Sequence, residues 1–336
     1  MREKTIDLGN CLVIGGSGML GMQLVKQLRQ QGYPVTSLDL DPMQFDGAIP
    51  IIGDIRNISD IEKACEGIDT IFQTASIIWD PKLADSVYYD TNVKGNQNVI
   101  DVCKKLRIPR LIYTSTLDVL VDGYKPISDG NDEMSYPSKM PKDPYSRTKI
   151  LAEKAVLEAN NPKEGLFTCS LRPVGIYGPG DKYHIGNLVT MARNNLKVKL
   201  GNGSARFSFV YVENVAHAHI EAAKQLHDES RVPGNAYIIS DSTPPSNFFL
   251  FLNEYLKAFS LPPLTKSIPG GLAFGIAGIA EIFAPKAKFN RFSVAQTCRD
   301  HVFIGTKAET DFGYTPIVSQ EEAFTRTVDW FKKNWI

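Results

Sequence analysis

The chain has 336 residues, of which 43% are hydrophobic and 22% are charged, and 37 Lys and Arg residues balance 37 Asp and Glu residues. This composition excludes a disordered chain and is typical of a globular protein that buries a substantial core. The zero net charge, without a local run of basic residues, excludes the electrostatic footprint of a nucleic-acid-binding surface, so we expect a small-molecule partner and no nucleic acid.

The first half of the chain alternates short apolar runs with longer helical patterns. Strands are predicted over residues 11–14, 35–38, 49–52, 70–74, 111–114 and 167–171, and long helices over residues 85–106 and from Tyr145 onward. Because strands that alternate with helices form βαβ units, the sequence predicts an α/β fold with a Rossmann-type, doubly wound parallel sheet.

A glycine-rich turn follows the first predicted strand, with Gly15, Gly18 and Gly21 at the start of the first helix. Glycines at this spacing allow a tight turn, the approach of backbone N–H groups to a pyrophosphate, and close helix–strand packing. The second predicted strand ends at Asp39, where a carboxylate accepts hydrogen bonds from ribose hydroxyls and repels a 2′-phosphate. The sequence therefore predicts a dinucleotide site that prefers NAD to NADP; a turn aspartate without a ligand is the alternative interpretation of Asp39.

Tyr145 and Lys149 are four residues apart on a predicted helix, so they share one face. A nearby ammonium lowers the pKa of a phenol, which makes Tyr145 a better proton relay near neutral pH, and Lys149 can also hold the nicotinamide ribose. The strand over residues 111–114 leads to Ser115 and Thr116, whose hydroxyls are expected at the carboxyl edge of the sheet, where such folds bind ligands.

The chain resembles the extended short-chain dehydrogenase/reductases over about residues 10–230. Besides the glycine turn, Asp39 and the Tyr145/Lys149 pair, the matching motifs are Gly53-Asp54-Ile55, Asn92-Val93-Lys94-Gly95, Tyr113-Thr114-Ser115-Thr116, Leu171-Arg172-Pro173, and residues 176–180 and 209–216. Residues 149–157 and 210–219 are most similar to the 3β-hydroxysteroid dehydrogenase branch, which includes the sterol 4α-carboxylate 3-dehydrogenases.

This resemblance implies roles for individual residues. Tyr145 is the implied catalytic acid/base, Thr116 corresponds to the active-site serine of the family, with Ser115 as the alternative, and Asn92 corresponds to the asparagine that supports a proton-relay water. The implied cofactor-binding residues are Gly15, Ser17, Gly18, Met19, Leu20, Gly21, Asp39, Asp54, Ile55, Thr74, Ala75, Tyr145, Lys149 and Pro173. The expected substrate-binding residues are Trp79, Thr116 and Tyr177, with a packing role as the alternative for Trp79.

The implied function is NAD-dependent oxidation of a 3β-hydroxyl on a small apolar substrate such as a steroid or sterol. A 4α-carboxyl group on the substrate would turn the 3-ketone product into a β-keto acid, which can lose carbon dioxide. The alternatives are a nucleotide-sugar epimerase or dehydratase, a long-chain β-keto acid reductase, and a non-enzymatic NAD-sensing regulator. Sugar-nucleotide enzymes need cations for a diphosphate, whereas the stretch around residues 201–203 offers only Arg206; a regulator would typically lack the Tyr145/Lys149 pair.

Two parts are expected in the chain: an NAD-binding Rossmann domain over residues 1–180, and a smaller substrate lobe over residues 181–336 that is intertwined with it. The lobe includes an apolar segment, residues 267–285, whose uncharged run of 14 residues is shorter than the roughly 20 that a membrane-spanning helix needs. We interpret this segment as a lid over a lipid-like substrate or as a peripheral membrane contact flanked by lysines, with a core helix as the alternative.

The five cysteines are an odd number without a C-x-x-C pair, which indicates reduced core residues in a cytoplasmic protein. The uncharged run over residues 9–25 is not interpreted as an export signal, because acidic residues precede it and glycines interrupt it. The spacing of Cys, His and carboxylate residues predicts no metal site. A homodimer is compatible with the sequence.

Overall fold

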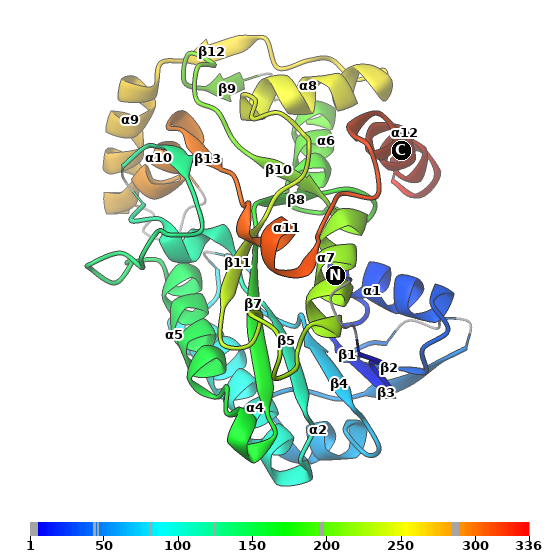
Figure 1. Ribbon diagram of the computed structural model, residues 1–336. Helices are drawn as coiled ribbons and strands as arrows, with labels where there is room; N and C mark the ends of the chain where they lie inside the picture. The colour runs from blue at the N-terminus through cyan, green and yellow to red at the C-terminus, as the bar shows by residue number, and fades with distance from the viewer. Residues whose placement is uncertain are drawn as a thin grey trace.

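A seven-stranded parallel sheet in the order β3-β2-β1-β4-β5-β7-β11 forms the centre of the protein (Figure 1). The computed structural model describes residues 6–42, 45, 47–80, 82–123, 125–194, 198–283 and 289–335. The strands are β1 (Cys11–Ile14), β2 (Val35–Asp39), β3 (Ala48–Ile52), β4 (Thr70–Gln73), β5 (Arg110–Thr114), β7 (Phe167–Pro173) and β11 (Ala236–Ile239). The strand order runs outward in opposite directions from β1 and β4, so the predicted Rossmann-type sheet is confirmed.

Helices cover both faces of this sheet. Helices α1 (Met19–Gln30) and α7 (Val212–Lys224) pack on one face, and α2 (Ile58–Ala64), α4 (Asn96–Leu106) and α5 (Pro144–Glu158) lie on the other. Cys11 and Val13 of β1 join the apolar cluster under α1 and α7, whereas Leu12 and Ile14 join the cluster under α2 and α4. Successive strand residues point to opposite faces, which is why a strand covered on both sides is apolar at every position.

The helix predicted over residues 85–106 is a continuous helical run with a change of winding inside it. It consists of α3 (Asp85–Tyr88), the π-helical segment η1 (Tyr89–Gly95) and α4. π-helical turns inside α-helices are rare, and those that occur often lie at functional sites. The structure thus adds a local irregularity that the apolar periodicity did not reveal.

A smaller lobe lies at the end of the sheet where the strands terminate (Figure 1). Three short parallel pairs belong to it: β8 (Gly175–Tyr177) with β10 (Phe209–Tyr211), β9 (Val198–Leu200) with β12 (Lys266–Ile268), and β6 (Ile127–Gly130) with β13 (His301–Phe303). Its helices are α6 (Ile185–Arg193), α8 (Phe248–Ala258), α9 (Gly270–Phe283), α10 (Arg291–Cys298), α11 (Lys307–Phe312) and α12 (Gln320–Asn334). The 3-10 turns η2 (Leu117–Leu120) and η3 (Pro162–Glu164) follow β5 and α5.

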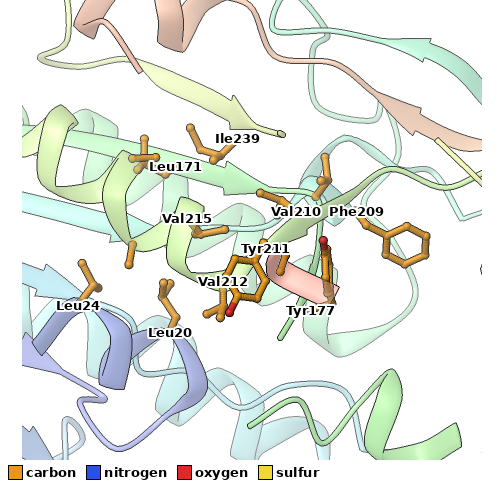
Figure 2. Packing of buried hydrophobic residues seen from close by; sticks show 14 of the residues in the cluster. Leu20, Leu24, Leu171, Tyr177, Phe209, Val210, Tyr211, Val212, Val215 and Ile239 are labelled. Carbon is orange, nitrogen blue, oxygen red and sulfur yellow. The ribbon is translucent and has the colours of Figure 1, made fainter. Parts of the chain in front are cut away.

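The lobe and the sheet share one apolar core. Figure 2 shows Leu171 of β7 and Ile239 of β11 near Val215 of α7, with Tyr177 and Tyr211 on the lobe side. The rings of Tyr177 and Tyr211 have centroids 5.6 Å apart. Both α7 and the edge strand β11 come from the chain after residue 180, so the later part of the sequence also completes the nucleotide sheet.

Four of the five cysteines are buried, and Cys298 is half-buried. Among the residues that the structure describes, none of the helices combines the length and the apolar content that a bilayer crossing requires. Of the apolar segment predicted over residues 267–285, Ala284 and Pro285 lie outside the described residues, as do the nearby Lys286 and Lys288.

Candidate active site

The glycine turn between β1 and α1 is tightly packed against the end of β4. Gly15 has a φ of +83°, and a Cβ there would lie 2.7 Å from the backbone nitrogen of Ala75 and 2.8 Å from Oγ1 of Thr74. A Cβ on Gly21 would lie 2.1 Å from the Gly15 carbonyl oxygen. Gly18, at the N-cap, provides no side chain to the first turn of α1. The turn therefore leads directly into the N-terminus of α1, whose first backbone N–H groups can bind an anionic group such as a dinucleotide pyrophosphate.

Asp39 lies at the carboxyl end of β2, directly beside this turn. Its Oδ2 accepts a hydrogen bond from the backbone N–H of Ser17 at 2.9 Å, and its Oδ1 accepts one from the backbone N–H of Leu40 at 2.8 Å. These bonds hold the carboxylate against the glycine turn. The turn and Asp39 together fit the adenosine half of a dinucleotide.

The other predicted cofactor residues differ in whether their side chains are buried in the core, lie near the glycine turn or are held in an ion pair. Leu20 and Ile55 have side chains buried in the core, so only their backbone could face a cofactor, and Pro173 is buried at the end of β7. Met19 is the first residue of α1, directly after the glycine turn, and its side chain lies close to Gly180. Asp54 is paired with Arg56, whose hydrogen bonds lower the pKa of that carboxyl.

Tyr145 and Lys149 occupy the first turns of α5, as predicted. Asp143 caps this helix by accepting a hydrogen bond from the Ser146 N–H at 2.7 Å. The Lys149 side chain is buried; its Nζ donates to the Thr114 carbonyl oxygen at 2.6 Å and lies 4.3 Å from the centre of the Tyr113 ring. Burial lowers the pKa of Lys149 to about 7, against the opposing charge of Glu153.

The Tyr145 phenol is in an environment that disfavours its ionisation. Burial and the charge of Asp118 raise its pKa, and the hydrogen bond with Thr116 acts in the opposite direction. The sequence-based expectation that Lys149 lowers this pKa is therefore wrong for the protein by itself. The physical reason is that desolvation dominates and that the ammonium is directed at Thr114.

The two alternatives for the active-site hydroxyl point to different places. The Thr116 hydroxyl lowers the pKa of the Tyr145 phenol, whereas the Ser115 side chain is buried and its Oγ has no hydrogen-bond partner among the described residues. Adjacent residues of an extended segment alternate in direction, which explains the difference. The structure brings Thr116, not Ser115, to Tyr145.

Asn92 lies in the π-helical segment η1 and is buried. Its Oδ1 accepts from the Ile77 N–H at 2.8 Å, and its Nδ2 donates to the Ile77 carbonyl at 3.1 Å and to Thr148 Oγ1 at 3.1 Å. This amide joins the loop after β4 to α5. The same loop carries Trp79, which is half-buried.

Tyr177 is not placed at the site as predicted. Its side chain is fully buried in an aromatic cluster of the lobe, 5.1 Å between centroids from Phe251, with its hydroxyl 3.4 Å from Thr243 Oγ1 (Figure 2). The prediction followed the position of Tyr177 next to a glycine-rich motif, but packing decides its role: it fills the core beneath the lobe.

The sequence analysis missed several buried polar groups that lie next to the residues of the candidate site. Glu153 and Arg172 form a buried ion pair at 2.7 Å, which also includes the Tyr136 hydroxyl. His219 bonds the Thr114 hydroxyl at 2.8 Å, and burial lowers its pKa to about 4. Glu153 lies four residues after Lys149 on the same helix, and this spacing could have indicated that the two side chains share a face. Within the described part of the chain, no group of three His, Cys, Asp or Glu side chains is arranged to hold a metal ion.

The sequence model described as the 3-beta hydroxysteroid dehydrogenase/isomerase family matches residues 12–269. The chain belongs to this family. It is 35% identical to the mouse (Mus musculus) sterol-4-alpha-carboxylate 3-dehydrogenase, decarboxylating, over 96% of this chain and 90% of that protein. It is also 35% identical to the human (Homo sapiens) short-chain dehydrogenase/reductase family 42E member 1, over 99% of this chain and 89% of that one.

The fold of this family member is shared with solved sugar-nucleotide enzymes. The UDP-glucose 4-epimerase of Thermus thermophilus, solved in complex with NAD, superposes with a TM-score of 0.73 at 21% identity, over 97% of this chain and 99% of that one. The protein is thus an oxidoreductase of the extended short-chain dehydrogenase/reductase type, in a family that binds NAD(P) and whose relatives include sterol dehydrogenases.

Proposed function

We propose that this protein oxidises the 3β-hydroxyl of a sterol or steroid with NAD, and that a 4-carboxysterol is one such substrate. The observation that carries the proposal is that Lys149, anchored to the Thr114 carbonyl at the end of β5, lies one helical turn after Tyr145 on α5, where the Thr116 hydroxyl lowers the pKa of the Tyr145 phenol. The relatives named for sterol 4-carboxylate oxidation support the substrate class.

Three residues have separate roles in the proposed reaction: one binds the substrate oxygen, one transfers the proton and one positions the cofactor. Thr116 holds the carbinol oxygen, and Tyr145, once deprotonated, takes the proton of that hydroxyl. Lys149 positions the cofactor ribose next to Tyr145. NAD, when bound, supplies the acceptor for the hydride that leaves the carbinol carbon. If carbon 4 carries a carboxylate, the bond to that carboxylate then breaks, its electron pair passes toward the new ketone, and carbon dioxide leaves.

The preference for NAD rests on Asp39. Two backbone N–H groups fix its carboxylate at the glycine turn, so the negative charge lies where a 2′-phosphate would have to bind. Kinetics with both cofactors test this point: a clear preference for NADP would contradict it.

The charge distribution favours a sterol over a nucleotide sugar. Arg206, which the sequence offered as a diphosphate contact, is engaged with Asp300, its Nη2 donating to Oδ2 at 2.9 Å. Purified protein with NAD should produce NADH absorbance with 3β-hydroxysterols or steroids in a panel that also contains nucleotide sugars and long-chain β-hydroxy acids. Reduction of NAD only by a sugar nucleotide would overturn the proposal.

We also propose that α9 contacts a lipid surface from which an apolar substrate reaches the site. Only Ala273 and Ala277 are buried on this helix. Its exposed apolar residues recur at a spacing of three to four, which places them on one stripe; they are Leu272, Ile276, Ile279, Ile282 and Phe283. Figure 1 shows α9 at the outer edge of the lobe, beyond α10.

Liposome co-sedimentation tests this contact. The double variant Ile279→Glu/Ile282→Glu should lose binding to phospholipid vesicles, while Ile52→Glu, an equally exposed position on the edge strand β3, should keep it. Vesicle binding that is the same in both variants would eliminate the contact.

A further inference from the structure

Asp118 is an acidic group beside the reacting hydroxyls that the proposed mechanism does not use. It lies in the first turn of η2, which Thr116 caps: the Asp118 N–H donates to Thr116 Oγ1 at 3.3 Å, and the Thr116 hydroxyl donates to Asp118 Oδ2 at 3.2 Å. Thr116 therefore points its hydrogen at Asp118 Oδ2, and its oxygen accepts from the Asp118 N–H. While Asp118 holds this hydrogen, Thr116 meets a carbinol group only through its own oxygen, and it has no hydrogen to donate to a ketone oxygen.

The surroundings of Asp118 are rich in ionisable groups. Asp143 and Tyr145 face it from the start of α5, and His184 from the start of α6. Tyr183, next to His184, faces the same phenol. Burial, followed by the charge of Asp143, raises the pKa of Asp118 to about 6, while the Thr116 hydrogen bond and His184 lower it. A pKa of about 6 puts the change of protonation state of Asp118 just below neutral pH.

We propose that Asp118 is a positioning residue that sets the direction in which the Thr116 hydroxyl donates. When ionised, Asp118 takes the Thr116 hydrogen. When protonated, Asp118 no longer needs that hydrogen and can itself donate to Thr116 Oγ1, so the hydroxyl is free to donate to the oxygen of a bound ketone.

The consequence concerns the reductive direction. A ketone accepts hydride at carbon from reduced NAD and the Tyr145 proton at oxygen, and a donated hydrogen bond from Thr116 stabilises the charge that develops on that oxygen. Protonated Asp118 therefore favours ketone reduction. This inference rests on the proposed function, because it assigns Thr116 to the substrate oxygen.

The kinetic test uses the full-length protein, NADH and a 3-ketosteroid. The reduction kcat should fall as pH rises through about 6, the pKa of Asp118. Asp118→Asn, which is always uncharged, should remove this step and raise kcat at pH 7 by roughly tenfold, since about a tenth of the wild-type carboxyl is protonated one unit above its pKa. A step near pH 6 that persists in Asp118→Asn overturns the proposal.

A double-mutant comparison shows whether Asp118 acts through Thr116. In a Thr116→Ala background, Asp118→Asn should leave kcat unchanged at pH 7. A gain that survives the loss of Thr116 would mean that Asp118 acts on Tyr145 by charge alone, which contradicts a positioning role.

A substrate-free measurement separates this inference from the proposed function. Carboxyl 13C NMR of the protein, with the Asp118 signal assigned by its loss in Asp118→Asn, should show a higher Asp118 pKa in Thr116→Val than in the wild type. An unchanged titration overturns the Asp118 proposal. Absence of any wild-type turnover of 3-ketosteroids would instead overturn the proposed function and leave the NMR result as the test of the Thr116–Asp118 contact.

Discussion

The sheet side and the lobe side of the molecule differ in how their residues are held. On the sheet side, polar site residues are fixed to backbone atoms: Lys149 to the Thr114 carbonyl and Asn92 to both polar groups of Ile77. On the lobe side, α9 buries only two alanines and exposes a row of large apolar side chains. The difference teaches that the proposed catalytic residues are held by backbone atoms of the sheet, whereas the proposed lipid contact lies on a helix that buries little of its own surface.

The largest effect is expected at the phenol. Tyr145→Phe should lower kcat at least 1,000-fold, on the order of what removal of a proton-transfer group costs, while NAD affinity changes little because the ring remains. Steady-state kinetics and calorimetric titration with NAD measure the two quantities. Tyr89→Phe, at a half-exposed tyrosine on η1, is the matched control and should retain full activity. Substantial turnover by Tyr145→Phe would remove the phenol from the mechanism.

The next largest effect is on the free energy of unfolding, where loss of a buried ion pair should cost more than loss of an exposed one. Glu153→Gln leaves Arg172 charged and buried, so the free energy of unfolding should fall by about 3–5 kcal/mol in urea denaturation. The exposed pair of Lys257 and Glu254 provides the control, since Glu254→Gln should cost less than about 1 kcal/mol.

The same pair predicts a pH dependence of stability. Burial raises the pKa of the folded Glu153, but the hydrogen bonds and charge of Arg172 and the hydrogen bond from Tyr136 outweigh it, so the pKa is lowered. A lowered acid pKa contributes stability that is present above the ordinary pKa of the group and lost as pH falls through the folded value. Glu153→Gln should therefore show a smaller loss of stability between pH 6 and acid than the wild type, and an equal loss in both would contradict this account.

A smaller effect is expected at Asp39, which we propose as the ribose contact. Asp39→Ala removes a charged hydrogen-bond acceptor, so kcat/KM for NAD should fall about 10- to 100-fold, as is typical of hydrogen bonds to charged groups. The value for NADP should change less, because a repulsive charge is removed as well. Asp41→Ala is the control: the described contact of Asp41 with Ser17 uses its backbone carbonyl. If the ratio between the two cofactors is the same in Asp39→Ala and wild type, Asp39 does not select the cofactor.

The smallest effect is expected on α9. Ile279 is 61% exposed, so Ile279→Gln should change the free energy of unfolding by less than about 0.5 kcal/mol. Ala277→Leu, on the buried face of the same helix, should cost about 1–3 kcal/mol through overpacking. Thermal or urea denaturation compares them, and a large loss in Ile279→Gln would mean that this face is covered in the protein.

The sequence predicted those features that depend on local pattern. Apolar runs such as residues 11–14 became strands, and the spacing of Gly15, Gly18 and Gly21 became a packed turn, because burial and sterics act on each residue directly. The strand β11 was missed because its four residues follow a Pro-Gly turn in an irregular region, and they become a strand only by pairing with β7.

Properties that depend on residues distant in the sequence could not be predicted. The upward shift of the Tyr145 pKa comes from desolvation in the folded site and from the charge of Asp118. The choice between Ser115 and Thr116 depends on which hydroxyl acts on Tyr145 in the folded site: Thr116 lowers the pKa of that phenol, whereas Ser115 is buried. Tyr177 was placed at the pocket by its neighbours in the sequence, whereas its neighbours in space are other aromatic rings.

The π-helical segment η1 also makes the helix before α5 sensitive to chain length. A π-helical turn closes i→i+5 and not i→i+4 hydrogen bonds, so a single deletion within residues 89–95 would change the winding and with it the angle between the residues before and after this segment. Asp85, which pairs with Arg147 of α5 at 2.9 Å, and the loop bound by Asn92 would lose their angular alignment together. The angular alignment of the two ends of this helix therefore depends on the number of residues between them, so insertions and deletions disturb it more than substitutions do.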